Sequence, residues 1–267
     1  MDYAKKKFGQ NFISDKNLIN KIINILDQEQ DHLIIEIGPG RGALTKELCK
    51  RFKKVVAIEI DTDLEVLLKS EINESNFELI MEDVLNVDLK KLIESNSCKK
   101  VSLISNTPYY ITSEIIFRTL DVSKFLDKAI FMVQKEVALR ICAKANENNY
   151  NNLSVAAQFY SEVNYEFTVN KNMFRPIPKV DSAIISLKFH QAYLNQIKDD
   201  KAFVAFVRKL FNNKRKTILN NLSTTINTKQ RATEILALTK IENNKRPENL
   251  SIEDFINIYK ETKNGNN

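Results

Sequence analysis

Three polar side chains that can bind a ligand, Glu59, Asp83 and Asn106, each follow a short apolar run of the sequence. A fourth apolar run leads into Gly38-Pro39-Gly40-Arg41-Gly42, which holds three of the five glycines of the chain. Glycines let a ligand approach backbone N–H groups closely. Glu59 follows the first of these glycines by about 20 residues, a spacing at which an acid can accept hydrogen bonds from ribose hydroxyls. Together these residues predict a site for a cofactor that contains a nucleoside.

The residues after the last apolar run, Asn106-Thr107-Pro108-Tyr109-Tyr110, indicate chemistry on the exocyclic amine of a base. Such an amine is a poor nucleophile because its lone pair is delocalised into the ring. The side-chain carbonyl of Asn106 and the backbone carbonyl of Thr107 or Pro108 can accept its N–H bonds and localise that lone pair. Pro108 lacks an N–H and stiffens the turn, and Tyr109 offers a face for base stacking worth on the order of 1–3 kcal/mol. We therefore predict that Asn106, Pro108 and Tyr109 form the catalytic group, acting on a base taken out of its stack.

Alternating strands and helices must position these groups. Helical patterns separate four apolar runs that have the length and composition of buried parallel strands, at 32–35, 55–61, 77–80 and 101–104. Parallel sheets of this kind bind ligands at the carboxyl ends of their strands, where the glycines and the polar side chains fall. The predicted fold class is α/β, with a Rossmann-like core over 1–190 and a small all-helical domain over 191–267.

The identity of the cofactor is open, because dinucleotides and methyl donors are both bound by a glycine turn and an acid after the second strand. Glu36 precedes the glycines, and its charge would repel a pyrophosphate but suits the amino and sulfonium groups of S-adenosylmethionine. No later pattern of Lys, Tyr or His indicates hydride transfer. Charge therefore favours S-adenosylmethionine over NAD. Its sulfonium already activates the methyl group, so that no metal is required and the rate depends on positioning and charge placement.

The composition narrows the class of protein. The chain has 267 residues, of which 43% are hydrophobic and 28% charged, as in a globular protein, and no apolar run approaches the roughly 20 residues of a membrane span. Three distant cysteines and two isolated histidines predict reduced thiols and no metal site. The net charge of +6 indicates polyanion partners only weakly. With no recognisable signal peptide and no feature that demands a dimer, we expect a cytoplasmic monomer.

With these residues the chain resembles the ribosomal RNA adenine N6,N6-dimethyltransferase family, and its small-subunit enzymes in particular. The resemblance covers nearly the whole chain, and its motifs are KFGQNFI from Lys7, EIGPGRGALT, AIEID, EDVL, the Asn106 group, MVQKEV, LSV and FRPIPKVDS from Phe174. It implies a methyltransferase that uses S-adenosylmethionine as co-substrate, binds RNA and takes part in rRNA processing and ribosome biogenesis. The implied substrate is a pair of adjacent adenosines near the 3′ end of 16S rRNA, in the 30S subunit or its precursor, each methylated twice.

The resemblance also implies how the methyl donor is bound. Asn11 and Ile13 are expected to touch it through the N-terminal segment, which folds over the cofactor in this family. Gly38 is expected beside the methionine part and Glu59 at the ribose. Asp83 is expected to bind the adenine amino group of the donor.

For the target base, the resemblance implies that Asn106 holds the amine while bordering the cofactor, and that Tyr109 and Phe174 stack on the ring. Two departures from the family's pattern lie near these motifs, since Thr107 replaces the usual Leu and Asn151-Asn152 replaces a frequent Gly. The Thr107 side chain is not expected to bind the amine, and Asn tolerates left-handed backbone geometry. We therefore expect both departures to be accommodated.

The C-terminal part predicts the surface that contacts RNA. From about Leu194 the pattern is helical, with apolar residues on one helix face. Basic residues cluster in the same segment, and taken alone they are typical of a solvated helix face. With an RNA substrate, contact with phosphates becomes the favoured interpretation. The predicted RNA-binding residues are Arg208, Lys209, Lys214, Arg215 and Lys216.

Two other functions of the same fold remain open. One is methylation of a large-subunit adenosine, which confers antibiotic resistance. The long motif that ends at Ser182 and the run Lys214-Arg215-Lys216-Thr217 favour the small-subunit enzyme over it. The other is a ribosome-assembly factor that keeps the fold without the chemistry, and the intact Glu59, Asp83 and Asn106 argue against it.

Overall fold

The structure, a computed structural model, describes residues 11–29 and 31–264 and divides into two compact units. The first unit comprises the chain up to Ala138 together with Val163–Phe189. The second comprises Leu139–Glu162 together with the chain from His190 onward. Residues 7–10 of the N-terminal motif lie outside the described residues.

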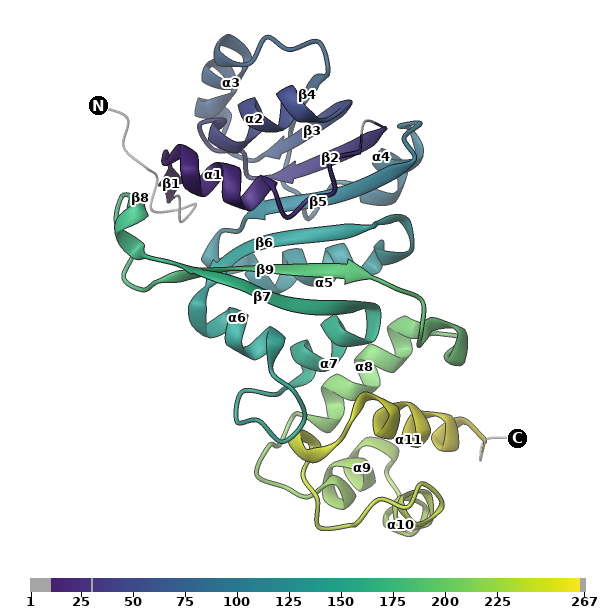
Figure 1. Cartoon of the computed structure of the whole chain (residues 1–267). Helices are drawn as coiled ribbons and strands as arrows, with labels where there is room; N and C mark the ends of the chain where they lie inside the picture. The colour runs from purple at the N-terminus through teal and green to yellow at the C-terminus, as the bar shows by residue number, and fades with distance from the viewer. Residues whose placement is uncertain (1–10, 30, 265–267) are drawn as a thin grey trace. The chain divides into compact units, whose positions relative to one another are not determined.

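The first unit is built on a seven-stranded sheet with the order β4-β3-β2-β5-β6-β9-β7 (Figure 1). Neighbouring strands from β4 to β6 are parallel, and β9 runs antiparallel to β6. This arrangement confirms the predicted α/β class with a parallel core. The strands are β2 (His32–Ile37), β3 (Lys54–Glu59), β4 (Phe77–Met81), β5 (Lys100–Asn106), β6 (Lys128–Gln134), β7 (Ser161–Val169) and β9 (Ser182–Phe189).

Helices cover both faces of this sheet. In Figure 1, α1 and α2 lie in front of the sheet and α5 lies behind it. Ile22 of α1 and Leu48 of α2 belong to one core cluster with Ile34 of β2 and Ile104 of β5, and each is at most 2% exposed. The helices of this part of the chain are α1 (Lys16–Ile23), α2 (Ala43–Arg51), α3 (Glu65–Glu71), α4 (Leu89–Glu94), α5 (Thr112–Asp121) and α6 (Lys135–Cys142).

The parallel register brings the carboxyl ends of three strands to one edge of the sheet. Ile37 of β2 pairs with Ile58 of β3 on one side and with Ser105 of β5 on the other. Glu59 and Asn106 are the next residues of their strands, and the glycine turn (residues 38–42) is the next segment after β2. These three groups therefore lie side by side, although they are far apart in the sequence.

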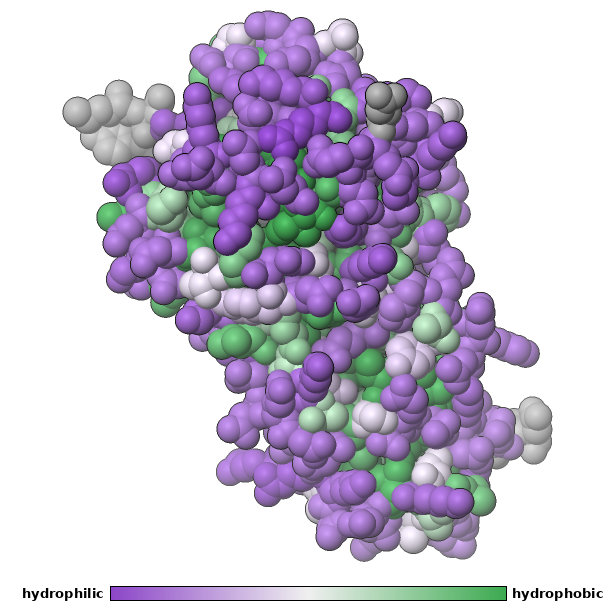
Figure 2. Space-filling view, in the orientation of Figure 1, coloured by the Kyte–Doolittle hydropathy of each residue, from purple (hydrophilic) through white to green (hydrophobic). Residues whose placement is uncertain are grey.

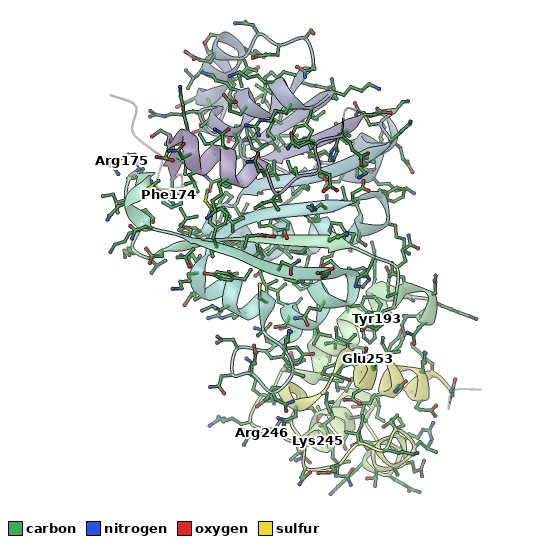
Figure 3. The ribbon with its side chains drawn as sticks, in the orientation of Figure 1. Phe174, Arg175, Tyr193, Lys245, Arg246 and Glu253 are labelled. Carbon is green, nitrogen blue, oxygen red and sulfur yellow. The ribbon has the colours of Figure 1, made fainter. Side chains whose placement is uncertain are left out.

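A separate two-stranded ribbon joins the start of the described chain to a later segment. β1 (Phe12–Ile13) pairs antiparallel with β8 (Phe174–Arg175), with Phe12 opposite Arg175 and Ile13 opposite Phe174. Ile13 and Phe174 are buried in the core of the first unit, with 5% and 1% of their surface exposed. Figure 3 shows Phe174 and Arg175 on this arm of the first unit. The ribbon thus anchors the N-terminal segment to the sheet domain.

The second unit is helical, and it contains a helix that the predicted boundary at 190 leaves in the first domain. Phe159 of α7 packs on Phe203 of α8 with ring centroids 4.6 Å apart, and it also stacks on Tyr193 at 6.0 Å. The Tyr193 hydroxyl donates to a carboxylate oxygen of Glu253 in α11, 2.6 Å away (Figure 3). The helices of this unit are α7 (Asn152–Tyr160), α8 (Asp200–Leu210), α9 (Ile218–Ile226), α10 (Lys229–Leu238) and α11 (Ile252–Asn264).

The backbone of Asn151 does not adopt the left-handed conformation that we expected. Its backbone is extended, with φ of −156° and ψ of −173°, so the expected left-handed geometry is wrong. Its Oδ1 instead accepts hydrogen bonds from the backbone N–H groups of Leu153 and Ser154, and the Ser154 hydroxyl accepts from the Asn151 N–H. This reciprocal capping box starts α7.

Among the helices of the described residues, none combines the length and the apolar character that a membrane crossing requires.

Candidate active site

A pocket lies at the carboxyl edge of the sheet, where the sequence predicts the ligand. Strand ends, the turns that follow them and the N-terminal segment all contribute to its wall. The predicted site residues that line it are Asn11, Gly38, Glu59, Asp83, Asn106 and Pro108. The fold therefore gathers positions from across the first hundred or so residues into one cavity.

The carboxylate of Glu59 connects two sides of this pocket. Its Oε1 accepts from the N–H groups of Ile60 and Asp61, at 3.0 and 2.9 Å, and its Oε2 accepts from the N–H of Gly40 at 3.2 Å. The side chain is buried, and this burial raises the pKa of Glu59, while the backbone N–H donors oppose the rise. A carboxylate has more lone pairs than these three donors use, so Glu59 can also accept from a ligand hydroxyl.

Glycine is required in the turn above this carboxylate. Gly38 and Gly40 have φ values of +73° and +57°, in the region that favours glycine over residues with a side chain. A Cβ on Gly40 would lie 3.0 Å from a ring carbon of Phe12, which is closer than ordinary van der Waals contact. The turn therefore lets the backbone and the Phe12 ring approach each other at the mouth of the pocket.

The orientation of the Asn106 amide is set by the N-terminal segment. Its Nδ2 donates a hydrogen bond to the backbone carbonyl of Asn11, 2.9 Å away. Because the donor end of the amide is engaged there, the opposite end presents the carbonyl oxygen Oδ1, which can accept a hydrogen bond from a bound amine. Asn106 is only half-buried, so this oxygen belongs to a side chain that a substrate can reach.

Thr107 is accommodated beneath the pocket. Its hydroxyl donates to Ser105 Oγ at 3.2 Å, and Ser105 in turn donates to the carbonyl of Ile37 at 3.1 Å. Only 2% of Thr107 is exposed, so the hydroxyl is directed into the sheet domain and not to solvent. The Thr107 hydroxyl therefore has a hydrogen-bond partner at a position where the resemblance leads us to expect Leu.

Three of the predicted site residues do not line the pocket. The Tyr109 hydroxyl lies 2.8 Å from Ser182 Oγ, and the partial burial of the ring raises its pKa. Phe174 and Ile13 are core residues, at 1% and 5% exposure. The roles given to these three residues stay predictions, because the structure buries the Phe174 and Ile13 side chains in the core.

Other residues of the lining were not predicted from the sequence. Tyr110 lines the pocket with 54% of its surface exposed, next to the half-buried Tyr109. Phe12, Ile58 and Ile60 provide apolar walls on either side of the Glu59 carboxylate. The sequence signal for Ile60 was its position directly after Glu59 at the end of a strand, where ligands of parallel sheets bind.

The charge of the pocket is one-sided. The described residues of its lining include the carboxyl groups of Glu59, Glu82 and Asp83 and no Lys, Arg or His. Such a lining favours a ligand with positive charge and disfavours a pyrophosphate. Within residues 11–29 and 31–264, no group of three or more His, Cys, Asp or Glu side chains is arranged to hold a metal ion.

Glu36 does not line this pocket, so the expectation that its charge faces the cofactor is wrong. The side chain is 1% exposed and lies inside the core. Burial, with a smaller contribution from the charge of Glu59, raises the pKa of Glu36 to about 7, and the nearby Thr45 hydroxyl opposes this rise. Among the described residues, no hydrogen-bond donor reaches the buried Oε2 of Glu36. The negative charge near the ligand therefore comes from the strand-end acids and not from Glu36.

The predicted RNA-binding residues all lie in the second unit and are exposed. Arg208 and Lys209 occupy the last turn of α8, and the run at 214–216 lies in the turn before α9. The N–H of Ile218 donates to the carbonyl of Lys245 at 2.7 Å, which brings a second basic pair, Lys245 and Arg246, to the same turn. Figure 3 marks that pair in the helical unit.

Comparison with known proteins gives consistent matches along the chain. A model of the family described as ribosomal RNA adenine dimethylase matches residues 1–264. Ribosomal RNA small subunit methyltransferase A of Mycoplasma capricolum is 64% identical, over 96% of this chain and 96% of its own length. The protein of the same name from Fusobacterium nucleatum is 44% identical over 96% of both chains.

Solved structures show the same fold. A dimethyladenosine transferase from Plasmodium falciparum has a TM-score of 0.77 at 25% sequence identity, covering 95% of this chain and 98% of that one. The 23S rRNA methyltransferase ErmE has a TM-score of 0.70 at 23% identity, covering 95% and 100% of the two chains.

The buried carboxyl of Glu36 predicts a pH dependence of stability. Because its pKa rises from 4.5 to about 7 on folding, the folded state binds more protons than the unfolded state between these values. The contribution of Glu36 to the free energy of unfolding should therefore be highest below pH 4.5 and fall as the pH rises to about 7, by up to about 3 kcal/mol. Urea unfolding of the wild type and of Glu36→Gln across this range measures the effect. Because the Gln variant does not titrate at this position, the stability of the wild type relative to the variant should fall between these pH values, and parallel profiles would contradict the assignment.

Proposed function

Because the chain belongs to the ribosomal RNA adenine dimethylase family, we propose that it transfers methyl groups from S-adenosylmethionine to the N6 amines of two adjacent adenosines in the 3′-terminal hairpin of 16S rRNA. Each adenosine is methylated twice, on the 30S subunit or its precursor, as a step of small-subunit biogenesis. The observation that carries this proposal is the orientation of Asn106, whose Nδ2 donates to Asn11 within a pocket lined by carboxyl groups.

The pocket suits S-adenosylmethionine as the methyl donor because its three carboxyl groups balance the amino and sulfonium charges. Glu59 accepts from the ribose hydroxyls, and Asp83 accepts from the adenine amino group. Gly38 leaves room for the methionine part against the backbone, since a Cβ there would already contact the carbonyl oxygen of Asn106 at 3.6 Å. Asn11 closes the pocket from the N-terminal side, and the buried Ile13 anchors that segment.

Catalysis follows from how the target amine is held. Held by Glu59 and Asp83, the donor would supply a methyl group that its sulfonium activates. The two N–H bonds of the adenosine amine donate to Asn106 Oδ1 and to the backbone carbonyl of Thr107, since the Pro108 carbonyl already accepts from the Ile111 N–H and the Thr112 hydroxyl. These bonds draw the lone pair out of conjugation and direct it toward the methyl. The new N–C bond would form as the bond from methyl to sulfur breaks, and the methylated amine would then release its proton to water. The contribution of the protein is positioning and electrostatic placement of the reacting atoms.

Aromatic residues hold the flipped base. We propose Tyr109 and Phe174 as its stacking partners, as the family resemblance implies, with the Phe174 side chain turning out of the core while its backbone pairing with Ile13 keeps Asn11 in place. Tyr110 is a third aromatic at this site, with an exposed ring beside the carboxyl groups of the pocket. Stacking on an aromatic face stabilises a base outside its helix without selecting its sequence.

The rRNA is held through its phosphates as well as through its target base. Arg208, Lys209 and the run at 214–216 are the proposed contacts in the helical domain, and the hydrogen bond from Ile218 to Lys245 adds Lys245 and Arg246 to that surface. All lie on exposed turns or helix ends, where they can reach phosphate oxygens. We further propose that the chain acts as a monomer, in the cytoplasm where ribosomes are assembled.

Methyl transfer to isolated subunits tests the proposed reaction. Labelled S-adenosylmethionine should transfer methyl groups to unmethylated 30S subunits and not to 50S subunits, and nucleoside analysis should find dimethyladenosine in the 3′-terminal hairpin. Transfer to the 50S subunit instead would favour the antibiotic-resistance enzyme. Donor binding without any transfer would favour a non-catalytic assembly factor.

Two substitutions should separate target activation from donor binding. Asn106→Ala should lower kcat by about 100- to 1,000-fold, because it removes an acceptor for the amine in the transition state. Glu59→Ala should instead weaken donor binding by roughly 10- to 100-fold, since it removes charged hydrogen bonds and frees the glycine turn. Calorimetry with the donor and single-turnover transfer to 30S subunits measure the two effects. Equal losses of donor affinity in both variants would show that the two roles are not distinct.

The basic turn before α9 should contribute to RNA affinity through ionic interactions. Replacing Lys214, Arg215 and Lys216 by Gln should reduce the slope of log affinity against log salt by about 0.7–0.9 for each phosphate that these side chains neutralise in the wild-type complex. Binding of 30S subunits at several KCl concentrations measures this slope. The matched control replaces the exposed Lys198, Lys229 and Lys240 of the same unit by Gln, and an equal reduction in the control would argue against a specific surface.

A further inference from the structure

A second cavity of the first unit has a different charge from the candidate active site. It is a groove of about 1030 Å³ between β1, α1, α2 and β8, at the upper end of the roughly 300–1,000 Å³ typical of small-molecule sites. One carboxylate, Glu47, lines it. The cations that line it are Lys16, Arg41, Lys46, Lys50 and Arg175, and we call the cavity the basic groove.

The lysines of the basic groove are available to a polyanion. Lys46 pairs with Glu71 at 2.6 Å and Lys50 with Glu47 at 2.7 Å, but all four side chains are at least 32% exposed. Exposed pairs of this kind are weak and exchange readily with other charges. Lys16 is the first residue of α1 and is exposed, on a surface that Figure 2 shows as mainly hydrophilic over α1 and α2.

The basic groove also has an aromatic and apolar wall. Phe12 and Ile19 line it, and the guanidinium of Arg41 lies over the Phe12 ring at 4.7 Å from the centroid. Cations interleaved with an aromatic ring suit the sugar–phosphate chain of a nucleic acid better than they suit an isolated inorganic anion. Arg175 lies opposite Phe12 in the ribbon and continues this wall, and Figure 3 shows it on the β8 arm.

The position of the basic groove connects it to the reaction. Phe12 lines both the groove and the pocket that holds Asn106, so the two cavities share a wall. An adenosine that is turned out of its stack into the pocket stays covalently linked to its neighbours. The phosphates beside it must therefore pass close to the mouth of the pocket, where the lining of the pocket itself carries only negative charge.

We propose that the basic groove binds the sugar–phosphate backbone of the rRNA next to the adenosine that is being methylated. This inference rests on the proposed function, because it assumes that the polyanion is the RNA substrate. It assigns a role to cations of the cofactor-binding unit, in addition to those of the helical domain.

The test neutralises the lysines of the groove and leaves Phe12, Arg41 and Arg175 in place. The variant Lys16→Gln/Lys46→Gln/Lys50→Gln should bind 30S subunits about tenfold or more weakly at about 100 mM salt, with a salt slope lower by roughly 2. The KM for 30S subunits should rise, while kcat at saturating substrate and the Kd of the methyl donor should stay unchanged. The retained donor affinity also shows that the variant is folded.

The matched control is Lys53→Gln/Lys69→Gln/Lys90→Gln, which removes three exposed lysines of the same unit that also form surface ion pairs. An RNA affinity and salt slope equal to those of the control would overturn the inference. A loss of affinity for 30S subunits with none for the protein-free 3′-terminal rRNA would also overturn it, since the partner would then be an acidic ribosomal protein. If the wild-type chain methylates no subunit, the proposed function fails. The RNA affinities of the variant and the control would still show whether the basic groove binds RNA.

Discussion

The pocket depends on one buried carboxylate, that of Glu59, which joins the end of β3 to the glycine turn. It accepts hydrogen bonds from the N–H groups of Ile60, Asp61 and Gly40. A buried carboxylate without such donors is costly, so the strand end and the turn must keep this arrangement for its charge to be tolerated. Gly40 in turn lies so close to Phe12 that a Cβ would crowd the ring. The position of β1 at the mouth of the pocket therefore depends on the same contact.

The catalytic end of β5 is completed by the N-terminal segment and not by the sheet alone. Asn106 receives its orientation from the carbonyl of Asn11, 95 residues earlier in the chain. Asn11 is held in place because β1 pairs with β8, which buries Ile13 against Phe174 in the core. A change in this ribbon would thus alter the direction of the Asn106 amide without touching any atom of the strand. The family motifs at both ends of the ribbon follow from this dependence.

The strands β2 to β5 and the residues at their ends that line the pocket could be predicted because both signals are local. Apolar runs mark the strands, and parallel pairing brings their ends to one edge whatever the details of packing. The environments of Glu36, Phe174 and Phe159 could not be predicted, because each depends on residues distant in sequence. Glu36 is buried by packing within the core, Phe174 is buried through the ribbon, and Phe159 joins the second unit through Phe203. Periodicity reports which residues are apolar but not which distant segment covers them.

The two cavities that share Phe12 divide charge in a way that suits the proposed reaction. Glu59, Glu82 and Asp83 give the pocket negative charge, whereas the basic groove is mainly positive. A cationic methyl donor and an anionic RNA would each be attracted to one cavity and repelled by the other, so that they do not compete. Transfer of the methyl group removes the sulfonium charge, which weakens the attraction of the spent donor to the carboxyl groups. The RNA keeps its charge in the groove. This asymmetry favours exchange of the donor while the substrate stays bound.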